Sequence, residues 1–399
     1  MTALEGMRIL DMTQYEAGPS GTQALAFLGA DVVKLEQPGA GDPGRTIAGQ
    51  SDSAYFYNWN ANKRSVALNL REPEGRELLL KMAPNFDVFV ENFGPGVVEK
   101  LDLGYDVLKE VHPPIIYASV KGFGLDGPYS HYKCFDGVAQ AASGAFSVTG
   151  TSDSPPMLPG TTTGDCGTGT QLALAITAAY VQRLKTGVGQ RIELSMQEAM
   201  TYYMRTRIGI GSGWGTKPAP RAGDARLAEL GTYACAPGGP NDYVVFMAVT
   251  PAMFASMCEV MGRPDLASDE RFTDARSRSR NAEALRAEIA AWSATLEKRE
   301  IMKMMGDAGV PCSAVLDTKD LHEDEHLLAR NFVKKIEHPV DGEVSIMGWP
   351  ARLSESEVEI TAAPGLGEHS ASVLRTELGL SEDEIDRLRS QGVIQVQGD

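Results

Sequence analysis

Short apolar runs that alternate with helical segments constrain most strongly how this chain can fold. The runs are Met7–Asp11, Asp31–Glu36, Ser65–Leu68, Asp87–Glu91, Pro114–Val120 and Arg191–Leu194. Helical patterns lie between or after them, at Thr22–Leu28, Glu72–Met82 and Thr168–Lys185. Strands separated by helices of about 10–15 residues form βαβ units around a parallel sheet. The sequence therefore predicts an α/β fold.

The composition and the order of the predicted elements change after residue 205. A loose, glycine-rich stretch at Gly209–Gly231 indicates a linker, and a strand–turn–strand pattern follows at Thr232–Val249. Helical patterns continue to Ala308, and Val310–Val315 is typical of a strand that returns the chain to the first domain. We therefore expect a discontinuous large domain at 1–205 and 310–399, a linker at 206–224, and a small α+β domain at 225–309.

Composition excludes several classes of protein. The 399 residues carry 37 Lys and Arg against 53 Asp and Glu, a net charge of −16, which disfavours a nucleic-acid partner. The nearly apolar run Leu172–Val181 is about half the ~20 residues that a membrane helix needs. The start of the chain lacks the basic and apolar regions of a signal peptide. These features predict a cytoplasmic protein without a membrane partner.

Two motif matches point to sites that the flanking residues do not support. Gly122–Gly127 matches the dinucleotide-binding pattern G-x-G-x-x-G, but Pro128 and Tyr129 follow it where that motif would open a helix. His322–His326 matches the zinc pattern H-E-x-x-H, but both of its variable positions are acidic. We expect a tight glycine-rich loop and an acidic surface segment, and no metal site.

One carboxylate stands in the glycine-rich segment Pro159–Gly169, just before a helical pattern. Gly164 and Gly167 flank Asp165 closely and leave room for a bulky group to approach it. Exposed backbone amides and the start of a helix favour an ionised, accessible carboxylate, which a carboxylate nucleophile requires. An aspartate before a helix is also a common N-cap, so these residues alone leave both interpretations open.

The sequence resembles the class III coenzyme A transferases, the family of formyl-CoA transferase and carnitine CoA-transferase. The resemblance runs from about residue 5 to 395 and is weakest at 208–240. The matching stretches include ILDMTQYEAGPSGTQALAFLGADVVKLEQPGAGD, NANKRSVALNL, VENFGPGVVEKLDLGYDVL, SVKGFG, GTTTGDCGTG, KTGVGQRIELSMQEA, AGVPCSAV and PGLGEHS. It implies a Rossmann-like large domain and an interlocked dimer of ring-shaped chains, with an identical or a homologous partner.

The resemblance implies that Asp165 is the catalytic nucleophile. Its carboxylate attacks a donor acyl-CoA, and CoA then moves through an aspartyl anhydride and an aspartyl-CoA thioester to an acceptor acid. Coenzyme A is a substrate here, and no prosthetic group is expected. The donors to the oxyanion are left open, because the family's glycine-rich loop in the small domain has no clear counterpart.

The resemblance also implies contacts with CoA. The matching positions are Tyr15, Leu68, Asn92, Phe93, Lys133 and Met196, and Lys100 stands where the family has an arginine. Gln37 also replaces an arginine, so Lys63, Arg64 and Arg45 become candidates for the phosphates. For Leu68, Phe93 and Met196, core packing is the alternative.

The acceptor acid is less well defined by the sequence. The pattern Gln14–Gly21 resembles transferases that use succinyl-CoA with alkyl- or arylsuccinates such as benzylsuccinate. The candidate substrate contacts are Gln14, Glu16, Ala17, Phe135 and Arg205. An isomerase that moves CoA within one dicarboxylate, of the mesaconyl-CoA type, and an acyl-CoA-binding subunit of a hetero-oligomer stay open. Phe135 stands where α-methylacyl-CoA racemases have a histidine, which disfavours that activity because phenylalanine cannot transfer a proton.

Overall fold

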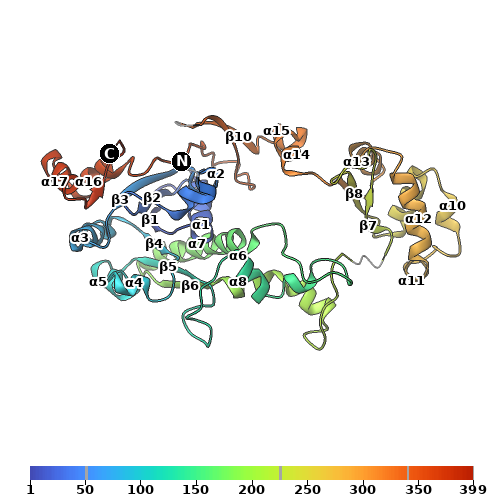
Figure 1. Cartoon of the computed structure of the whole chain (residues 1–399), viewed down its shortest axis with the longest axis horizontal. Coiled ribbons are helices and arrows are strands. Elements are labelled where there is room, and N and C mark those ends of the chain that lie inside the picture. Colours follow the sequence, from blue (N-terminus) through green and yellow to red (C-terminus); the bar gives the residue numbers. More distant parts are fainter. Residues whose placement is uncertain (50–52, 224–226, 339–340, 399) are drawn as a thin grey trace. The chain divides into compact units, whose positions relative to one another are not determined.

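The computed structural model describes residues 1–49, 53–223, 227–338 and 341–398 (Figure 1). The chain forms two compact units. The larger unit comprises residues 1–149, 156–219 and 331–399, and the smaller unit comprises residues 150–155 and 220–330. Among the described residues, none of the helices is long and apolar enough to cross a lipid bilayer.

Within the described residues, the larger unit contains a seven-stranded sheet in the order β12-β3-β2-β1-β4-β5-β6. Its strands are β1 (Arg8–Met12), β2 (Asp31–Glu36), β3 (Lys63–Leu68), β4 (Val88–Glu91), β5 (Ile116–Lys121), β6 (Arg191–Ser195) and β12 (Ile394–Gln395). Strands β1 to β6 pair in parallel, and only β12 runs antiparallel to its neighbour β3. The predicted α/β fold with a mostly parallel central sheet is confirmed.

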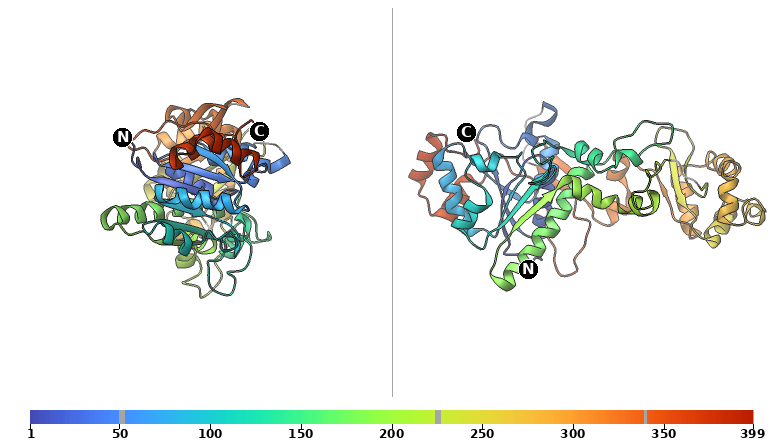
Figure 2. Two further views of the ribbon diagram at one scale, coloured as in Figure 1. Left: turned by 90° about the vertical axis from the view of Figure 1, so that its left-hand side faces the viewer. Right: turned by 90° about the horizontal axis from the view of Figure 1, so that it is seen from below.

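Helices cover both faces of this sheet, because successive residues of each strand point to opposite sides. Leu10 packs in the layer that contains α3 (Pro73–Met82), α5 (Tyr105–Val111), α16 (Ser370–Leu378) and α17 (Glu382–Ser390). Its neighbour Ile9 packs against α1 (Ala17–Ala26), α7 (Thr168–Thr186) and α8 (Met196–Tyr203). The right-hand view of Figure 2 shows the red C-terminal helices on one side of the strands and the green helix α7 on the other. Strands buried on both faces explain the nearly continuous apolar runs.

Shorter elements complete the larger unit. They are α2 (Ala54–Asn60), α4 (Val97–Lys100), α6 (Asp136–Ala142) and the antiparallel pair β10 (Val333–His338) and β11 (Gly342–Met347). After β5, the segment Gly122–Gly127 opens no helix, and the next helix along the chain is α6. This agrees with the interpretation of that segment as a glycine-rich loop.

The smaller unit packs helices on a three-stranded antiparallel sheet, counted over its described residues. The strands are β7 (Leu230–Ala234), β8 (Tyr243–Met247) and β9 (Cys312–Ala314). Its helices are α9 (Pro251–Val260), α10 (Asp265–Ser268), α11 (Ala275–Arg280), α12 (Ala282–Ser293), α13 (Lys298–Asp307), α14 (Thr318–Glu323) and α15 (Glu325–Ala329). Phe246, Met257, Leu285 and Ile301 belong to its own hydrophobic core.

The division between the units differs from the predicted one. Val310–Val315 was expected to return the chain to the large domain, whereas β9 pairs with β8, with Cys312 opposite Phe246. Apolar pairing partners explain the placement, because the run extends the small sheet and its Val310 joins the core of the smaller unit. The predicted border between linker and small domain, at 224 and 225, lies outside the described residues.

Candidate active site

The candidate site lies where the connections of the parallel sheet change direction. From β1 the chain builds the sheet outward through β2 and β3, and then returns to β4 on the other side of β1 before continuing to β5 and β6. The loops that leave β1 and β4 therefore diverge, and in open α/β sheets ligands bind in the crevice at this point, beyond the carboxyl ends of the strands.

A pocket of about 310 Å³ lies at this edge. Its walls come from the segments that follow β1, β4 and β5 and from the first residue after β6. The lining residues are Gln14, Tyr15, Ala17, Asn92, Phe93, Gly94, Pro95, Val97, Val120, Lys121, Gly122, Tyr132, Lys133, Cys134, Phe135, Asp165 and Met196. Most of the wall is apolar or aromatic, with a few polar groups, which is the usual composition of a small-molecule site.

Close packing of two helices brings Asp165 to this pocket. Every residue of α1 is buried, and α1 packs along α7, the helix that follows Asp165. A Cβ atom on Gly21 of α1 would lie 2.7 Å from the carbonyl oxygen of Gly169 in α7, and one on Gly169 would lie 2.2 Å from the Oγ of Ser20. The absence of side chains at Gly21 and Gly169 thus sets how closely the start of α7 approaches the loop after β1.

Asp165 lies in a single π-helical turn, Thr163–Gly167, directly before α7. Its backbone N–H faces Oδ1 of Asp136 at 3.2 Å and the carbonyl oxygen of Thr162 at 3.1 Å. Gly164 is tightly packed, since a Cβ atom there would lie 2.5 Å from the carbonyl oxygen of Asp136. π-helical turns are rare and frequent at functional sites. The glycine therefore allows close contact with α6, which differs from its predicted role of leaving free space.

Three carboxylates determine the electrostatics of the site. The side chain of Asp165 is only 8% exposed, and burial together with the nearby charges of Glu16 and Asp136 raises its pKa to about 7. The sequence predicted an ionised, accessible carboxylate, so this expectation is corrected. Desolvation and like charges outweigh the favourable field of a helix start. A perturbed carboxyl group of this kind in a crevice is a candidate for chemistry.

Glu16 lies beside the pocket without lining it. It is 2% exposed, and the Oγ1 of Thr162 donates a hydrogen bond to its carboxylate at 2.5 Å. Burial raises its pKa, with the charge of Asp136 adding to this effect and hydrogen bonds from Thr162, Tyr55 and Trp59 opposing it. Because Thr162 immediately precedes the turn that holds Asp165, Glu16 affects Asp165 through both its charge and its hydrogen bond.

Two cysteines lie close to this carboxylate cluster. Cys134 lines the pocket, and burial together with the charges of Asp165 and Asp136 raises the pKa of its thiol to about 11. The pKa of Cys166 is also raised, first by burial and then by the charge of Glu16. Both thiols are therefore protonated at neutral pH, and neither is an activated nucleophile.

The structure brings many of the predicted residues together. The predicted positions that line the pocket with Asp165 are Tyr15, Asn92, Phe93, Lys133, Met196, Gln14, Ala17 and Phe135. Phe135 is 60% exposed and meets Tyr15 edge-on, with ring centroids 5.7 Å apart. The carboxamide of Asn92 bonds both the N–H and the carbonyl oxygen of Gln14, each at 2.8 Å. Asn92 thus joins the loops after β1 and β4.

Other predicted residues do not line this pocket. Leu68 is 1% exposed and belongs to the sheet core, which agrees with the core-packing alternative. Lys100 is exposed at the end of α4, and Arg205 is exposed with its guanidinium over the ring of Tyr202.

The three phosphate candidates have other partners. The buried Lys63 pairs with Asp11 at 2.9 Å, and the buried Arg45 pairs with Glu36 at 2.7 Å. Arg64 pairs with Asp31, the first residue of β2, at the amino-terminal ends of the parallel strands and so away from the pocket. The suggestion that Lys63 and Arg45 bind phosphate is therefore corrected, because both cations are neutralised inside the protein.

Sequence reasoning did not select several pocket residues. Lys121 ends β5 and donates to the carboxylate of Glu91 at 2.8 Å and to the carbonyl oxygen of Phe93 at 2.7 Å. The sequence does contain a signal for Lys121, because a charged residue there ends the apolar run Pro114–Val120. Tyr132 gave no such signal, because it lies in an irregular loop. No cluster of metal-binding residues occurs among the residues that the structure describes; His322 and His326 lie on the separate helices α14 and α15.

Comparisons with known proteins fit this geometry. The sequence matches the family described as CoA-transferase family III over residues 4–370. It is 42% identical to a formyl-CoA:oxalate CoA-transferase from Streptomyces coelicolor over 412 residues, which cover 98% of this chain and 99% of that protein. One from Rhodopseudomonas palustris (strain BisA53) is 36% identical over 419 residues, covering 98% and 97% of the two chains. A CAIB/BAIF family protein from Brucella suis has a similar crystal structure, with a TM-score of 0.84, 29% identity, and coverage of 94% of this chain and 99% of that one.

Proposed function

The chain belongs to CoA-transferase family III, and we propose that it moves coenzyme A from an acyl-CoA to a carboxylic acid through covalent intermediates on Asp165. The observation that carries this proposal is a buried carboxylate, that of Asp165, with a pKa of about 7. It lies in the wall of the pocket of about 310 Å³ at the carboxyl ends of the strands. A carboxylate of raised basicity is a stronger nucleophile than an ordinary aspartate once it has lost its proton.

The proposed reaction replaces the thioester of the donor by a thioester of the acceptor in four exchanges. A carboxylate oxygen of Asp165 attacks the donor thioester, the C–S bond breaks, and CoA leaves as a thiolate while a mixed anhydride forms. The thiolate attacks the aspartyl carbonyl, releases the donor acid, and leaves an aspartyl-CoA thioester. The acceptor carboxylate then displaces CoA to form a second anhydride, and CoA attacks the acceptor carbonyl to release the new acyl-CoA and free Asp165. These steps require no prosthetic group, because Asp165, CoA and the two acids supply every nucleophile.

Several pocket residues support the binding of CoA beside Asp165. Lys133 is exposed at the pocket wall and offers a point charge to a phosphate. Tyr15, Phe93 and Met196 supply apolar and aromatic surface for the rest of the cofactor. We propose no contact from Leu68, which is buried in the core.

We propose a dicarboxylate as the acceptor, with succinyl-CoA as the donor. The support is the sequence pattern at Gln14–Gly21, of which Gln14, Tyr15 and Ala17 line the pocket. A second candidate pair is formyl-CoA and oxalate, because relatives of that name are 42% and 36% identical to this chain. Oxalate is itself a dicarboxylate, so both candidates place a second carboxylate in the same pocket. Isomerisation within one dicarboxyl-CoA would use the same Asp165.

We further propose a dimer, interlocked as the family resemblance implies. Side chains of α7 that point away from its own unit support an interface: Leu174 is 71% exposed and Leu184 is 66% exposed. Large exposed apolar side chains along one helix often mark a surface that a partner covers. Light scattering after size-exclusion chromatography gives the mass directly, and a monomer at micromolar concentration would contradict this part of the proposal.

Trapping the covalent intermediate tests the catalytic proposal. The protein is incubated with succinyl-CoA or formyl-CoA without acceptor, treated with hydroxylamine or borohydride, and digested for mass mapping. We expect a modified peptide that contains Asp165 with the true donor, and none with Asp165→Ala. An acceptor screen that includes oxalate, succinate and benzylsuccinate then separates the two substrate pairs. An acyl-CoA-binding subunit without activity would give no modified peptide with either donor.

A further inference from the structure

The loop between β1 and α1 is held in place by side chains from other parts of the sheet. The loop runs from Thr13 to Glu16, and its residues Gln14 and Tyr15 line the pocket. Tyr15 has a φ angle of 62°, in the left-handed region that non-glycine residues rarely adopt. A backbone conformation of this kind persists only where the surroundings fix it.

Charged and polar side chains bond successive backbone groups of this loop. The N–H of Thr13 donates to Oδ1 of Asp11 at 3.0 Å, and its carbonyl oxygen accepts from Nζ of Lys34 at 2.9 Å. Asn92 bonds the N–H and the carbonyl oxygen of Gln14. The N–H of Tyr15 donates to Oδ1 of Asp42 at 3.0 Å.

Lys34 and Asp42 connect two of these contacts. Nζ of Lys34 lies 2.8 Å from Oδ2 of Asp42, and both side chains are almost completely buried. Neither residue lines the pocket. Since electrostatic interactions are strong in a poorly polarisable interior, the ion pair fixes the carboxylate of Asp42, and this carboxylate fixes Tyr15.

We propose that Lys34 and Asp42 are positioning residues of this enzyme, which set the backbone of Tyr15 and thereby the pocket wall beside Asp165. Stability alone gives no reason for such a pair, because well-packed apolar side chains often replace a buried ion pair without loss. What apolar side chains cannot replace is the pair of bonds to the loop, from Lys34 to Thr13 and from Tyr15 to Asp42.

Hydrogen exchange and CoA binding together test this proposal. The variants are Asp42→Ala, which removes the acceptor for Tyr15, Asp42→Asn, which keeps an acceptor oxygen but loses the charge, and Lys34→Met. We expect Asp42→Ala and Lys34→Met to speed exchange in the peptide that covers residues 13–17 by about tenfold or more. The dissociation constant for CoA, measured by calorimetry, should rise by about tenfold. Asp42→Asn should change both quantities less than Asp42→Ala.

Arg183→Met is the matched control. It breaks the ion pair of Arg183 with Asp87. Asp87 directly precedes β4, at the amino-terminal ends of the parallel strands and so away from the pocket. We expect it to lower the melting temperature without changing exchange at residues 13–17 or the affinity for CoA.

The outcomes separate this proposal from the proposed function. If Asp42→Ala and Lys34→Met lower only the melting temperature, as Arg183→Met does, or if Asp42→Asn equals Asp42→Ala in exchange, positioning is refuted. If Asp42→Ala does not fold, unchanged exchange in both Lys34→Met and Asp42→Asn refutes it. The CoA measurement rests on the proposed function. A wild-type protein that fails to bind CoA contradicts that function, while the exchange comparison still decides the role of Lys34 and Asp42.

Discussion

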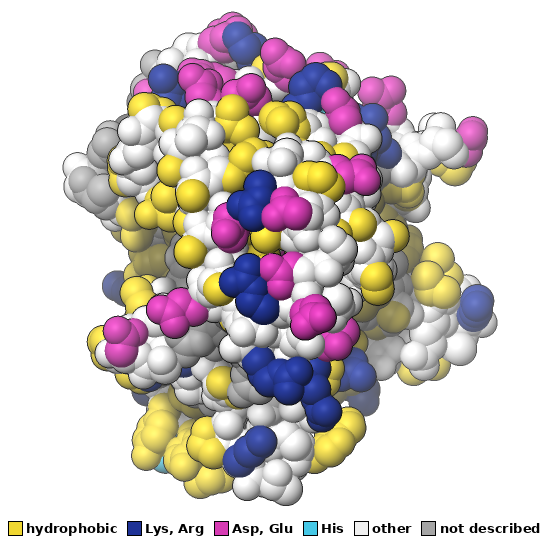
Figure 3. All heavy atoms as spheres, turned by 90° about the vertical axis from the view of Figure 1, so that its right-hand side faces the viewer, with side chains coloured by type: hydrophobic (Ala, Val, Ile, Leu, Met, Phe, Trp, Pro, Cys, Tyr) yellow, Lys and Arg dark blue, Asp and Glu magenta, His cyan; other side chains and the backbone are white. Residues whose placement is uncertain are grey.

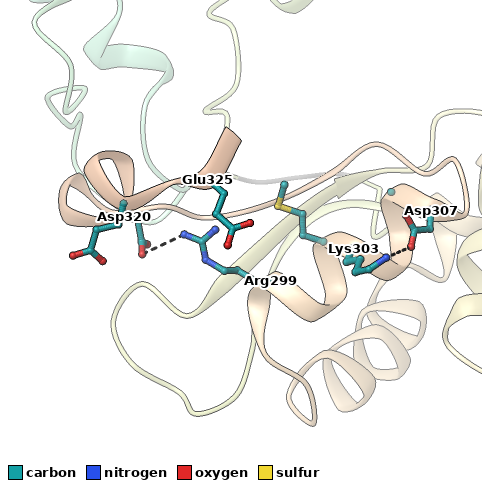
Figure 4. Close-up of a pocket in the computed structure, with 8 residues that line it drawn as sticks. Arg299, Lys303, Asp307, Asp320 and Glu325 are labelled. Atoms are coloured by element: carbon teal, nitrogen blue, oxygen red, sulfur yellow. Dashed lines mark hydrogen bonds and ion pairs between the residues drawn. The ribbon is translucent and has the colours of Figure 1, made fainter. Parts of the chain in front are cut away.

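Two pockets of this protein differ in how their surroundings shift the pKa of a carboxyl group. The pocket of the smaller unit, of about 650 Å³, is lined by Arg299, Met302, Lys303, Gly306, Asp307, Asp320, Glu323 and Glu325 (Figure 4). Two ion pairs join its lining residues: Lys303 pairs with Asp307 at 2.5 Å, and Arg299 pairs with Asp320 at 3.7 Å. The pocket of the larger unit is smaller, about 310 Å³, and has Asp165 in its wall with Glu16 and Asp136 nearby.

The difference lies in the partners of the acidic groups. The hydrogen bond from Lys298 lowers the pKa of Asp320, whereas burial and two like charges raise the pKa of Asp165. On the face of the molecule in Figure 3, basic and acidic side chains also lie next to one another in several places. Neither volume nor charge content therefore sets the candidate site apart; its distinguishing feature is a buried carboxylate whose neighbours oppose its ionisation.

Removal of the carboxylate of Asp165, the proposed nucleophile, should have the largest effect. We expect Asp165→Ala to lower CoA transfer by about 10³-fold or more, because no other described carboxylate lines the pocket to form the anhydride. Asp320→Ala, the matched change in the other pocket, should leave steady-state activity within about twofold. Full transfer activity in Asp165→Ala would show that the covalent route is wrong.

The stability of Asp165→Asn should depend on pH in a characteristic way. The folded pKa of about 7 lies above the ordinary value of 3.8, so ionisation of Asp165 costs folded-state stability as the pH rises from about 4 to about 7. Asparagine does not ionise. At pH 8 the variant should exceed the wild type in free energy of unfolding by up to about 4 kcal/mol, since one pKa unit corresponds to about 1.4 kcal/mol. Urea denaturation at pH 4 should show no difference.

Asp320→Asn provides the opposite sign. The pKa of Asp320 is lowered in the folded protein, so its ionised form stabilises the fold above its ordinary pKa. This variant should therefore lose stability at pH 8 and not at acidic pH. Equal behaviour of the two variants would remove the distinction between the pockets.

The pH profile of activity should reveal the like-charge neighbour. Because the proposed attack requires ionised Asp165, kcat/KM should rise through about pH 7 and then level off. Glu16→Gln removes one negative neighbour, so the midpoint should move to lower pH by about one pH unit. Activity relative to the plateau would then rise several-fold at pH 6. A midpoint unchanged in Glu16→Gln would show that its charge does not reach Asp165.

The smallest effect is expected from the exposed ion pair in the pocket of the smaller unit. Lys303 and Asp307 are one helical turn apart, with side chains 76% and 69% exposed. Asp307→Asn should reduce the free energy of unfolding by only about 0.3–0.5 kcal/mol and leave activity unchanged. Thermal denaturation in low salt measures this. A loss of several kcal/mol would mean that this pocket carries a structural role that its exposure does not suggest.

The sequence alone predicted the strands of the sheet and the location of Asp165 just before a helix. It did not predict the environment of Asp165. Apolar runs separated by helices predicted β1 to β6, because strands buried on both faces need apolar residues throughout. The raised pKa of Asp165 depends on Glu16 and Asp136, which are distant in the sequence and meet only through packing.

The sequence also did not predict which side chains of a buried strand face a ligand. Leu68 was expected to contact CoA, but in a strand buried on both faces the pattern does not tell which side chain faces a ligand. Lys63 and Arg45 became candidates for the phosphates because Gln37 replaces an arginine, and nothing local in the sequence predicts their actual partners Asp11 and Glu36. The strand at 312–314 was assigned to the wrong sheet for a related reason, since an apolar run does not specify which strand it pairs with.

The protonated thiols beside the carboxylate cluster bear on the fidelity of the reaction. A cysteine thiolate near the proposed acyl anhydride or CoA thioester would attack its carbonyl and capture the acyl group, with the carboxylate or CoA thiolate as the leaving group, and this adduct would stall the enzyme. Cys134 lines the pocket with a thiol pKa of about 11, and the pKa of Cys166 is also raised. Burial, together with the charges of the same carboxylate cluster, thus keeps both thiols protonated, so that neither competes with the thiolate of coenzyme A in the proposed reaction.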